Sequence, residues 1–476
     1  MKRAKRLYVM SGILAVVCIS AFAVIKYDEK QEDIKNSGEI IMNVDTGSVN
    51  SLSWTCDGES LAFHRDEIWL YDDDETFPVD EDKINSLLEQ FREFSAAFII
   101  ENVTDYGQYG LDSPLCTINF SDGENDYEVT LGDFSPMDSQ RYVSIGDGNV
   151  YLVNNDPLDS FDVPLSDMID NDEVPEFDNT SSITFSGSES YQIVYREYTK
   201  DSTYTCCSED IYFKQEGEEL LPLDTSHVES YLNTVSGLFL TDYAAYDVQD
   251  DELSAYGLDD PELTVEIQYT PEGESEENVQ TFSLSISRDP EEREADETAD
   301  NTDKEETDET NTDEEDITAY IRAGDSKIVY NITADTYRTL MASGYDDLRH
   351  REVFTADFED VTGMDASLDG AVYSITSEGK GDSKIFYYNE EELEVSALKS
   401  ALENIRADSF TEETPDQKEE LSLTVYLNNK AFPQVQLDFY RYDGKHCLAA
   451  IDGKICSLVP RSDVVELIEA LNAIIL

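Results

Sequence analysis

The feature that most constrains the fold of this chain is a motif that occurs twice. Residues 108–118 read Gln-Tyr-Gly-Leu-Asp-Ser-Pro-Leu-Cys-Thr-Ile, and residues 255–265 read Ala-Tyr-Gly-Leu-Asp-Asp-Pro-Glu-Leu-Thr-Val. Tyr, Gly, Leu, Asp, Pro and Thr match in register, which is typical of an internal repeat. A chain of 476 residues is long enough for two to four domains. The motif therefore predicts several related units in tandem.

The sequence around the motif repeats as well. The segments Phe77-Pro78-Val79-Asp80 and Leu221-Pro222-Leu223-Asp224 each precede apolar residues at three- and four-residue spacing, which predicts a helix. A third such stripe lies in residues 393–410. Asp80 suits a helix N-terminus, where a carboxylate accepts from free N–H groups. The stripes consist of Ile84, Leu87, Leu88, Phe91 and Phe94, then Val228, Tyr231, Leu232, Val235 and Leu238, then Val395, Leu398, Leu402 and Ile405.

Short strands joined by tight turns fill most of each unit. Asp57-Gly58 predicts a hairpin, and turns at 145–150, 323–328 and 451–455 each separate two further strands. A last helix is expected over 462–476. The fold class predicted is α+β, with tandem antiparallel sheets that are each covered by helices. We place repeat 1 at 51–170, repeat 2 at 180–352 and a diverged repeat 3, which lacks the motif, at 358–476.

Repeat 2 carries an acidic insertion at 289–316. It holds 16 acidic and 2 basic residues, so it contributes 2 − 16 = −14 to the net charge. A segment of this composition buries too little apolar surface to fold, so we expect it to be disordered.

The N-terminus predicts a membrane anchor. Residues 1–6 form a basic tail, and residues 7–25 contain neither a charged residue nor a proline. Nineteen helical residues extend about 28 Å, close to the thickness of a bilayer core. The basic flank stays in the cytoplasm, so a linker at 26–50 and the body lie outside. Two alternatives are a cleaved signal peptide at Ala21-Phe22-Ala23 and a lipoprotein signal at Cys18.

Charge and cysteine content limit the partners. The 32 basic and 106 acidic residues give a net charge of −74, which argues against nucleic acid and against anionic lipid surfaces. Six cysteines lie outside the anchor, and an exported region permits disulfides. Cys447 and Cys456 flank a hairpin turn, although buried free thiols are an equal alternative for every cysteine. The six are Cys56, Cys116, Cys206, Cys207, Cys447 and Cys456.

No motif assigns a catalytic, cofactor-binding or metal-binding residue. The Tyr-Gly-Leu-Asp-x-Pro motif is interpreted as a structural turn, with a binding role as the alternative. The four histidines do not form a metal-binding sequence and are expected at surfaces or in turns. Residues 396–399 match the Ser-x-x-Lys motif of penicillin-recognising enzymes. They are expected in the middle of a helix, and the match is interpreted as a coincidence. Acidic runs such as 72–75 lack calcium-loop spacing, so diffuse counterion binding is expected. The histidines are His64, His227, His350 and His446.

The tandem pattern resembles a bacterial family known as domain of unknown function 4340. The resemblance covers repeat 1 densely, repeat 2 more loosely, and repeat 3 departs from it. It implies an N-terminal membrane segment, an envelope-facing body and, for some members, association with ABC-type export systems; it implies no catalytic residue. The matching segments are Leu52-Ser53-Trp54-Thr55-Cys56-Asp57-Gly58-Glu59, Trp69-Leu70-Tyr71, Phe77-Pro78-Val79-Asp80, Tyr109-Gly110-Leu111-Asp112-Ser113-Pro114 and Val150-Tyr151-Leu152-Val153.

Three functions follow as hypotheses. The first is a non-enzymatic envelope protein in the cell membrane, anchored by one helix, that interacts with a transporter subunit or another envelope protein. The second is an extracytoplasmic hydrolase of cell-wall polymer or glycan, which requires a cleft that gathers carboxylates or a histidine from distant positions. The third is a low-affinity cation-binding surface protein. No cofactor is expected for the first.

Overall fold

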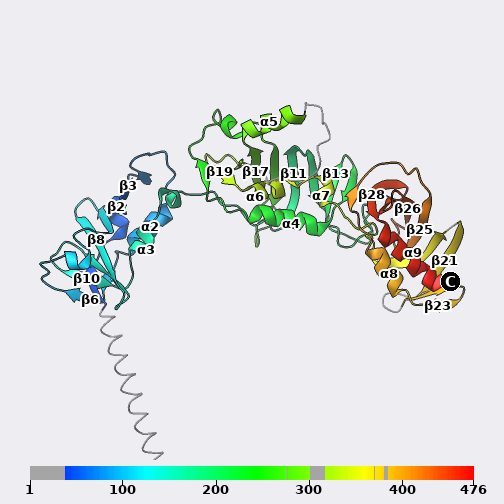
Figure 1. Ribbon diagram of the computed structural model, residues 1–476, viewed down its shortest axis with the longest axis horizontal. Coiled ribbons are helices and arrows are strands. Elements are labelled where there is room, and N and C mark those ends of the chain that lie inside the picture. Colours follow the sequence, from blue (N-terminus) through cyan, green and yellow to red (C-terminus); the bar gives the residue numbers. More distant parts are fainter. Residues whose placement is uncertain (1–37, 276, 301–316, 369, 380–383, 476) are drawn as a thin grey trace, which may run out of the picture. The chain divides into compact units, whose positions relative to one another are not determined.

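The computed structural model describes residues 38–475, except 276, 301–316, 369 and 380–383 (Figure 1). The predicted basic tail at 1–6 and membrane helix at 7–25 lie outside these residues. Among the described helices, none is long and apolar enough to cross a bilayer. The described residues form two compact units: unit 1 comprises those within 38–172 and 241–248, and unit 2 comprises those within 173–240 and 249–475.

Unit 1 contains the sheet of repeat 1, and the strand order is β4-β3-β2-β7-β8-β9-β10-β6. All of the paired neighbours are antiparallel. The predicted hairpin at Asp57-Gly58 joins β2 to β3. The strands are β2 (Ser51–Cys56), β3 (Glu59–Arg65), β4 (Trp69–Tyr71), β6 (Phe98–Ile100), β7 (Cys116–Ser121), β8 (Asp126–Ser135), β9 (Gln140–Ser144) and β10 (Val150–Val153).

Two short helices, α2 (Glu81–Glu89) and α3 (Leu158–Phe161), complete repeat 1. Ile84, Leu87 and Leu88 of α2 are buried, as the apolar stripe predicts, while Phe94 belongs to strand β5 (Phe94–Ala96). Part of the expected linker is ordered, because β1 (Glu39–Met42) pairs with β5. The strand reads Glu-Ile-Ile-Met, an apolar stretch within the otherwise polar linker, and its pairing with β5 is irregular between Ile40 and Met42.

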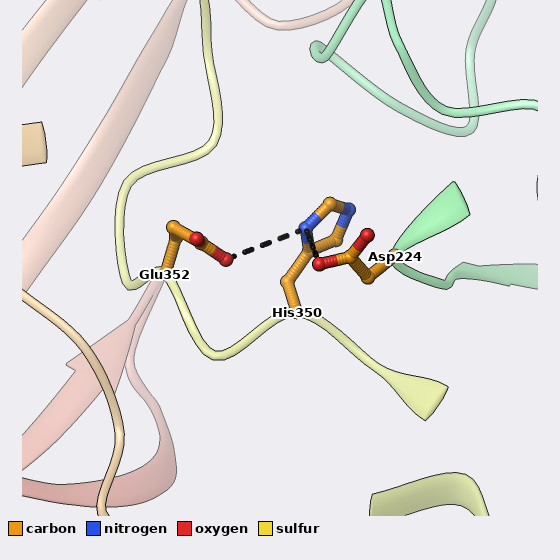
Figure 2. Close-up of side chains that lie close together, drawn as sticks. All are labelled: Asp224, His350 and Glu352. Atoms are coloured by element: carbon orange, nitrogen blue, oxygen red, sulfur yellow. Dashed lines mark ion pairs between the residues drawn. The ribbon is translucent and has the colours of Figure 1, made fainter. Parts of the chain in front are cut away.

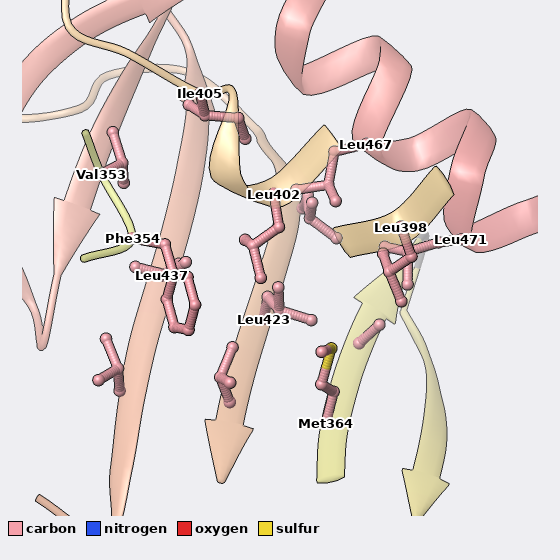
Figure 3. Close-up of a cluster of buried hydrophobic side chains, with 14 of the residues drawn as sticks. Val353, Phe354, Met364, Leu398, Leu402, Ile405, Leu423, Leu437, Leu467 and Leu471 are labelled. Carbon is pink, nitrogen blue, oxygen red and sulfur yellow. The ribbon is translucent and has the colours of Figure 1, made fainter. Parts of the chain in front are cut away.

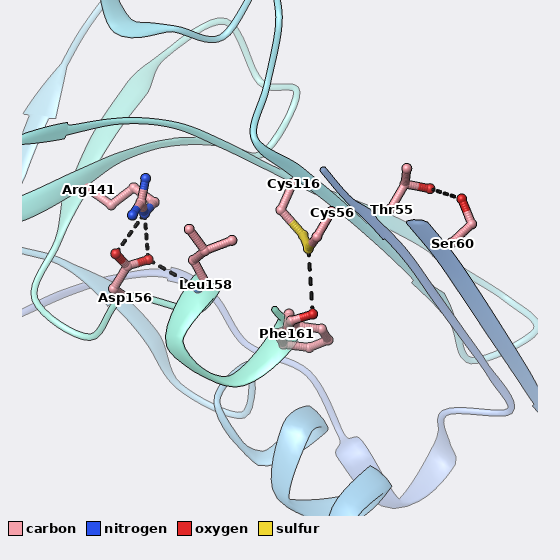
Figure 4. The surroundings of a disulfide bond; sticks show 8 residues. All are labelled: Thr55, Cys56, Ser60, Cys116, Arg141, Asp156, Leu158 and Phe161. Atoms are coloured by element: carbon pink, nitrogen blue, oxygen red, sulfur yellow. Dashed lines mark hydrogen bonds and ion pairs between the residues drawn. A yellow bond between two sulfur atoms is a disulfide. The ribbon is translucent and has the colours of Figure 1, made fainter. Parts of the chain in front are cut away.

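A disulfide joins Cys56 to Cys116 (Figure 4). These two residues are direct partners in the register of β2 and β7. Cys447 and Cys456 are free thiols on the paired strands β27 (His446–Ile451) and β28 (Lys454–Pro460), where Cys447 lies opposite Val459. The sequence alone leaves the pairing of the cysteines open, and the strand register of repeat 1 brings Cys56 and Cys116 together.

Unit 2 begins with the sheet of repeat 2, in which β14-β13-β12-β11-β16-β17-β18-β19 are consecutive neighbours. The helices of this repeat are α4 (Thr225–Ser236), α5 (Pro290–Asp300), α6 (Ala334–Met341) and α7 (Tyr345–Leu348). The strands are β11 (Thr180–Gly187), β12 (Tyr191–Tyr195), β13 (Tyr212–Glu216), β14 (Glu219–Pro222), β16 (Leu263–Tyr269), β17 (Gln280–Arg288), β18 (Ala319–Ala323) and β19 (Val329–Ile332). A short strand, β15 (Tyr243–Ala245), lies in the segment that belongs to unit 1.

Repeat 3 has a sheet of the same design, with the order β23-β22-β21-β20-β25-β26-β27-β28-β24. The predicted third copy is thus present in topology although it lacks the motif. Its helices are α8 (Ser396–Glu403) and α9 (Arg461–Ile475). The strands are β20 (Val361–Leu368), β21 (Ala371–Glu378), β22 (Ile385–Tyr388), β23 (Glu391–Leu393), β24 (Ser409–Phe410), β25 (Glu419–Leu427), β26 (Gln434–Arg441), β27 (His446–Ile451) and β28 (Lys454–Pro460).

The core of repeat 3 lies between its sheet and its two helices (Figure 3). Leu398 and Leu402 of α8 and Leu467 and Leu471 of α9 are buried against strand residues such as Leu423. Each fully buried leucine contributes roughly 1.5–3 kcal/mol through the hydrophobic effect. The helix expected over 393–410 is shorter than predicted, because its ends become β23 and β24. The last helix agrees with the prediction within one residue.

The repeated motif forms the predicted turn in both copies. Gly110 and Gly257 adopt left-handed backbone conformations, with φ of 73° and 67°. A Cβ atom on Gly110 would lie 2.6 Å from the Asp133 carboxyl group, so a larger residue does not fit. Leu111 and Leu258 are buried beside the turn. The turn leads directly into β7 in repeat 1 and into β16 in repeat 2. This shared structural role explains why the motif occurs twice.

The acidic insertion differs from expectation at its start, where α5 occupies residues 290–300. The Asp289 carboxylate accepts a hydrogen bond from the Glu291 backbone N–H, a typical helix-start contact. Arg293 donates from Nη1 to the backbone oxygens of Gly257 and Asp260 and thereby ties the helix to the motif turn. Residues 301–316 of the insertion lie outside the described residues.

Candidate functional site

Unit 2 contains a cleft of about 970 Å³. The segment 350–360, which follows α7, forms one wall together with residues near the start of α4. The polar lining is mostly acidic, with Lys200 and Lys399 as the lysines. Its acidic residues are Glu209, Asp224, Glu229, Glu352, Asp357, Glu359, Asp360 and Glu403.

Asp224 is placed in the cleft because it caps helix α4. Its Oδ1 accepts from the backbone N–H of Ser226 at 2.8 Å and from the Ser226 hydroxyl at 2.6 Å. Its own backbone N–H donates to the Leu348 carbonyl, which fixes the start of α4 against the end of α7. The second carboxylate oxygen, Oδ2, lies 4.0 Å from Nδ1 of His350.

His350 is held by a buried carboxylate on the opposite side of its ring. Its Nε2 lies 2.7 Å from Oδ1 of Asp210, a residue that is only 1% exposed. Asp210 in turn accepts at Oδ2 from the Thr205 hydroxyl at 2.5 Å. These bonds orient the imidazole so that Nδ1 faces Asp224 and Glu352 (Figure 2).

Glu352 is positioned by the strand-like pairing of its segment with repeat 3. It forms an isolated antiparallel bridge with Arg406, flanked by backbone hydrogen bonds at Val353 and Ala407. The Arg406 guanidinium lies 2.8 Å from Oε1 of Glu352. The other oxygen, Oε2, lies 3.9 Å from Nδ1 of His350. We call Asp224, His350 and Glu352 the trio; their ligand atoms all lie within 4.8 Å of one another.

The surroundings of His350 and Asp224 favour the charged forms of both side chains. Burial disfavours the imidazolium form of His350, but the hydrogen bond to Asp210 and the surrounding carboxylates outweigh it and raise the pKa of the ring. Burial also acts against the Asp224 carboxylate, yet the hydrogen bonds from Ser226 and the nearby His227 and His350 lower its pKa. The site can therefore hold a positive charge, whether that charge is a proton on His350 or a bound cation.

The other residues considered in the sequence are dispersed. His64 bonds with Asp72, and His446 contacts Asp443. In the acidic run 72–75, each aspartate has its own partner: Asp73 accepts from Tyr71, and Asp74 accepts from Thr76 and Tyr246. Ser396 begins α8 and is not in mid-helix as expected.

His227 lies in the first turn of α4, and its Nε2 is 3.8 Å from Oδ2 of Asp224. Asp224, His227 and His350 lie in separate parts of the sequence, and no local pattern links them. Asp210 and His350 are 140 residues apart and meet only in the folded chain.

The protein is thus built of tandem antiparallel sheet-and-helix repeats, with an acidic, histidine-containing cleft in unit 2. The chain belongs to the family described as domain of unknown function (DUF4340), whose sequence profile matches residues 69–261 and 216–424. Each match begins within one repeat and ends within the next, and the second includes the first part of repeat 3. No curated protein and no solved structure matches the chain.

Proposed function

We propose that this protein is a single-pass membrane protein with an extracytoplasmic body, and that the body is a non-enzymatic interaction module of the cell envelope. The observation that carries the interaction role is the acidic cleft of unit 2. Its carboxylates outnumber its lysines, so it favours a positively charged segment of a partner protein. A subunit of an ABC-type transporter is one such partner, in line with the family resemblance.

Two features support the location. The uncharged segment 7–25 has the length of a bilayer span and follows a basic tail. The Cys56–Cys116 disulfide is of a kind that persists in oxidising compartments and is rare in the cytoplasm. A membrane-impermeant labelling reagent applied to intact cells should therefore modify the body of the protein. Labelling only after the cells are broken would contradict the proposed topology.

The interaction role is tested by crosslinking in membranes. Wild type should recover a transporter subunit or another envelope protein, and the triple variant Glu229→Gln, Glu359→Gln, Asp360→Asn should lose it. These residues line the cleft but lie outside the trio. A matched control, Glu124→Gln with Asp126→Asn and Glu128→Gln, removes three exposed charges from unit 1 and should leave recovery unchanged. Recovery of the protein alone, or equal recovery with the cleft variant, would count against the proposal.

A second candidate is an extracytoplasmic hydrolase acting on cell-wall polymer or glycan. One observation favours it: a histidine and carboxylates from distant sequence positions share one cleft. Purified wild-type protein should then release fragments from wall polymer or glycan, and His350→Gln should abolish the release. No release by wild type above a no-protein control would remove this candidate.

A further inference from the structure

We propose that Asp224, His350 and Glu352 bind a divalent transition-metal ion of the Zn²⁺ class. The inference does not depend on the partner or reaction proposed above, because it rests on the geometry of three side chains. Nothing in the sequence pattern indicates this site, since its ligands come from the start of α4 and from the segment after α7.

Each member of the trio is held in place through one atom and presents another atom to the site. Asp224 uses Oδ1 to cap α4 and directs Oδ2 toward His350. Glu352 pairs through Oε1 with Arg406 and directs Oε2 toward the same ring. His350 contacts Asp210 through Nε2 and presents Nδ1. Three ligand atoms that converge while their other atoms are fixed form a prepared site.

A buried carboxylate lies on the far side of the His350 ring from the other two members of the trio. Histidine ligands of metals characteristically donate their other ring N–H to a carboxylate, which fixes the tautomer and the ring orientation. Asp210 occupies this position at 2.7 Å and is almost fully buried. With the proton on Nε2, the lone pair of Nδ1 points toward the oxygens of Asp224 and Glu352.

The distances and the ligand atoms of the trio favour an ion of the Zn²⁺ class. Zn²⁺ bonds of roughly 2.0–2.2 Å place tetrahedral ligand atoms roughly 3.3–3.6 Å apart. The histidine-to-carboxylate distances of 3.9 and 4.0 Å need only small side-chain rotations to close around such an ion. An imidazole nitrogen suits Zn²⁺, Cu²⁺ or Ni²⁺, whereas Ca²⁺ and Mg²⁺ prefer oxygen ligands alone. Three protein ligands leave a coordination position for water or a ligand from the cleft.

The test is calorimetric titration of the full-length protein with Zn²⁺, at constant ionic strength and with excess Mg²⁺ to occupy the many surface carboxylates. Wild type should bind one Zn²⁺ per chain at a distinct site. His350→Gln should abolish that site, and Asp210→Asn should weaken it about 10- to 100-fold, as expected for a group behind a ligand.

The control uses the same kind of helix cap in repeat 1. Asp80 caps α2 through the Lys83 backbone N–H, so Asp80→Asn matches Asp224→Asn in its local effect. Asparagine caps helices about as well as aspartate, so both variants should fold, which circular dichroism checks. Asp224→Asn should weaken Zn²⁺ binding at least about tenfold while Asp80→Asn leaves it unchanged. Wild type without a distinct site, or a site insensitive to His350→Gln, would overturn the inference.

Discussion

Repeats 1 and 2 begin their first helix in the same way but surround it with different chemistry. Asp80 and Asp224 each cap a helix, and their backbone N–H groups donate to Met168 and Leu348 respectively. Two residues after these carbonyls, repeat 1 has Asp170 where repeat 2 has His350. The helix cap and its backbone hydrogen bond, which both repeats share, are therefore structural. Repeat 2 differs because it has a histidine at the position of Asp170, and this histidine completes the proposed ligand set.

The two repeats also differ in how ion pairs are buried. In repeat 1, Arg141 and Asp156 are 8% and 12% exposed and only 2.6 Å apart (Figure 4). In repeat 2, Arg288 and Glu262 are 22% and 14% exposed. A buried charge that loses its partner costs more free energy where it is less exposed to water. Removal of one partner should therefore destabilise repeat 1 more than repeat 2.

The largest effect should come from Asp156→Asn. The substitution keeps the shape of the side chain but leaves the buried Arg141 without its counter-charge. The free energy of unfolding of unit 1 should fall by about 3–5 kcal/mol. Calorimetry that resolves the unfolding of the two units measures this, with the transition of unit 2 as the internal control. A loss below about 1 kcal/mol would show that water reaches Arg141.

Removal of the disulfide should have the next largest effect. The double variant Cys56→Ala, Cys116→Ala should lower the free energy of unfolding of unit 1 by about 2–4 kcal/mol. At the equivalent paired position, repeat 2 has Gly187 opposite Leu263. Reducing agent should therefore shift only the transition of unit 1 in wild type and should shift nothing in the double variant. An equal shift in both units would contradict this assignment.

Glu262 should make repeat 2 sensitive to acid. Burial acts against its charge, but hydrogen bonds from Arg288 and Tyr337 lower its pKa below the usual 4.5. Its stabilising contribution is therefore full above pH 4.5 and is lost as the pH falls through the lowered value. Glu262→Gln should cost about 1–2 kcal/mol near neutral pH.

The measurement is urea unfolding of wild type and Glu262→Gln across the acidic range. The difference between the two proteins should narrow as the pH falls below about 4.5. Repeat 1 has Leu115 at the corresponding motif position, so Leu115→Ala serves as a variant whose effect should not narrow in this way. A difference independent of pH would indicate that the Glu262 charge contributes nothing.

The smallest effect concerns the caps themselves. Asp80→Ala and Asp224→Ala should each cost about 1 kcal/mol in the free energy of unfolding, because each removes an acceptor from a helix N-terminus. Added Zn²⁺ should stabilise the wild type and Asp80→Ala but not Asp224→Ala. Thermal shifts with and without Zn²⁺ at constant ionic strength measure both effects. Equal stabilisation of Asp80→Ala and Asp224→Ala by Zn²⁺ would contradict the proposed difference between repeats 1 and 2.

The sequence predicts many of the helices and turns of the fold, but it does not predict the trio. Spacing alone places α4, α9 and the hairpin at Asp57-Gly58, because apolar periodicity and turn residues act locally. The motif turn is predictable for the same reason. The helix over 393–410 is overestimated because strand pairing at β23 and β24 outweighs helical spacing at its ends.

The trio could not be predicted from the sequence, since its geometry depends on contacts between distant segments. His350 lies in a connection with no periodic pattern, and Asp224 carries the signature of an ordinary helix cap. Only the backbone pairing of Asp224 with Leu348 and of Glu352 with Arg406 brings the ligands together. His350 and Glu352 are the last histidine and glutamate of the predicted repeat 2, at 180–352, and no local pattern links them to Asp224.

X-ray absorption at the zinc edge tests most directly whether repeat 2 binds a metal ion through the trio. The full-length protein loaded with one Zn²⁺ should show one imidazole nitrogen together with oxygen ligands, at about 2.0–2.2 Å. The imidazole contribution should disappear in His350→Gln and persist in Asp80→Asn. A shell of oxygen alone in the wild type would contradict the account, because the two repeats would then bind cations only through their general negative charge.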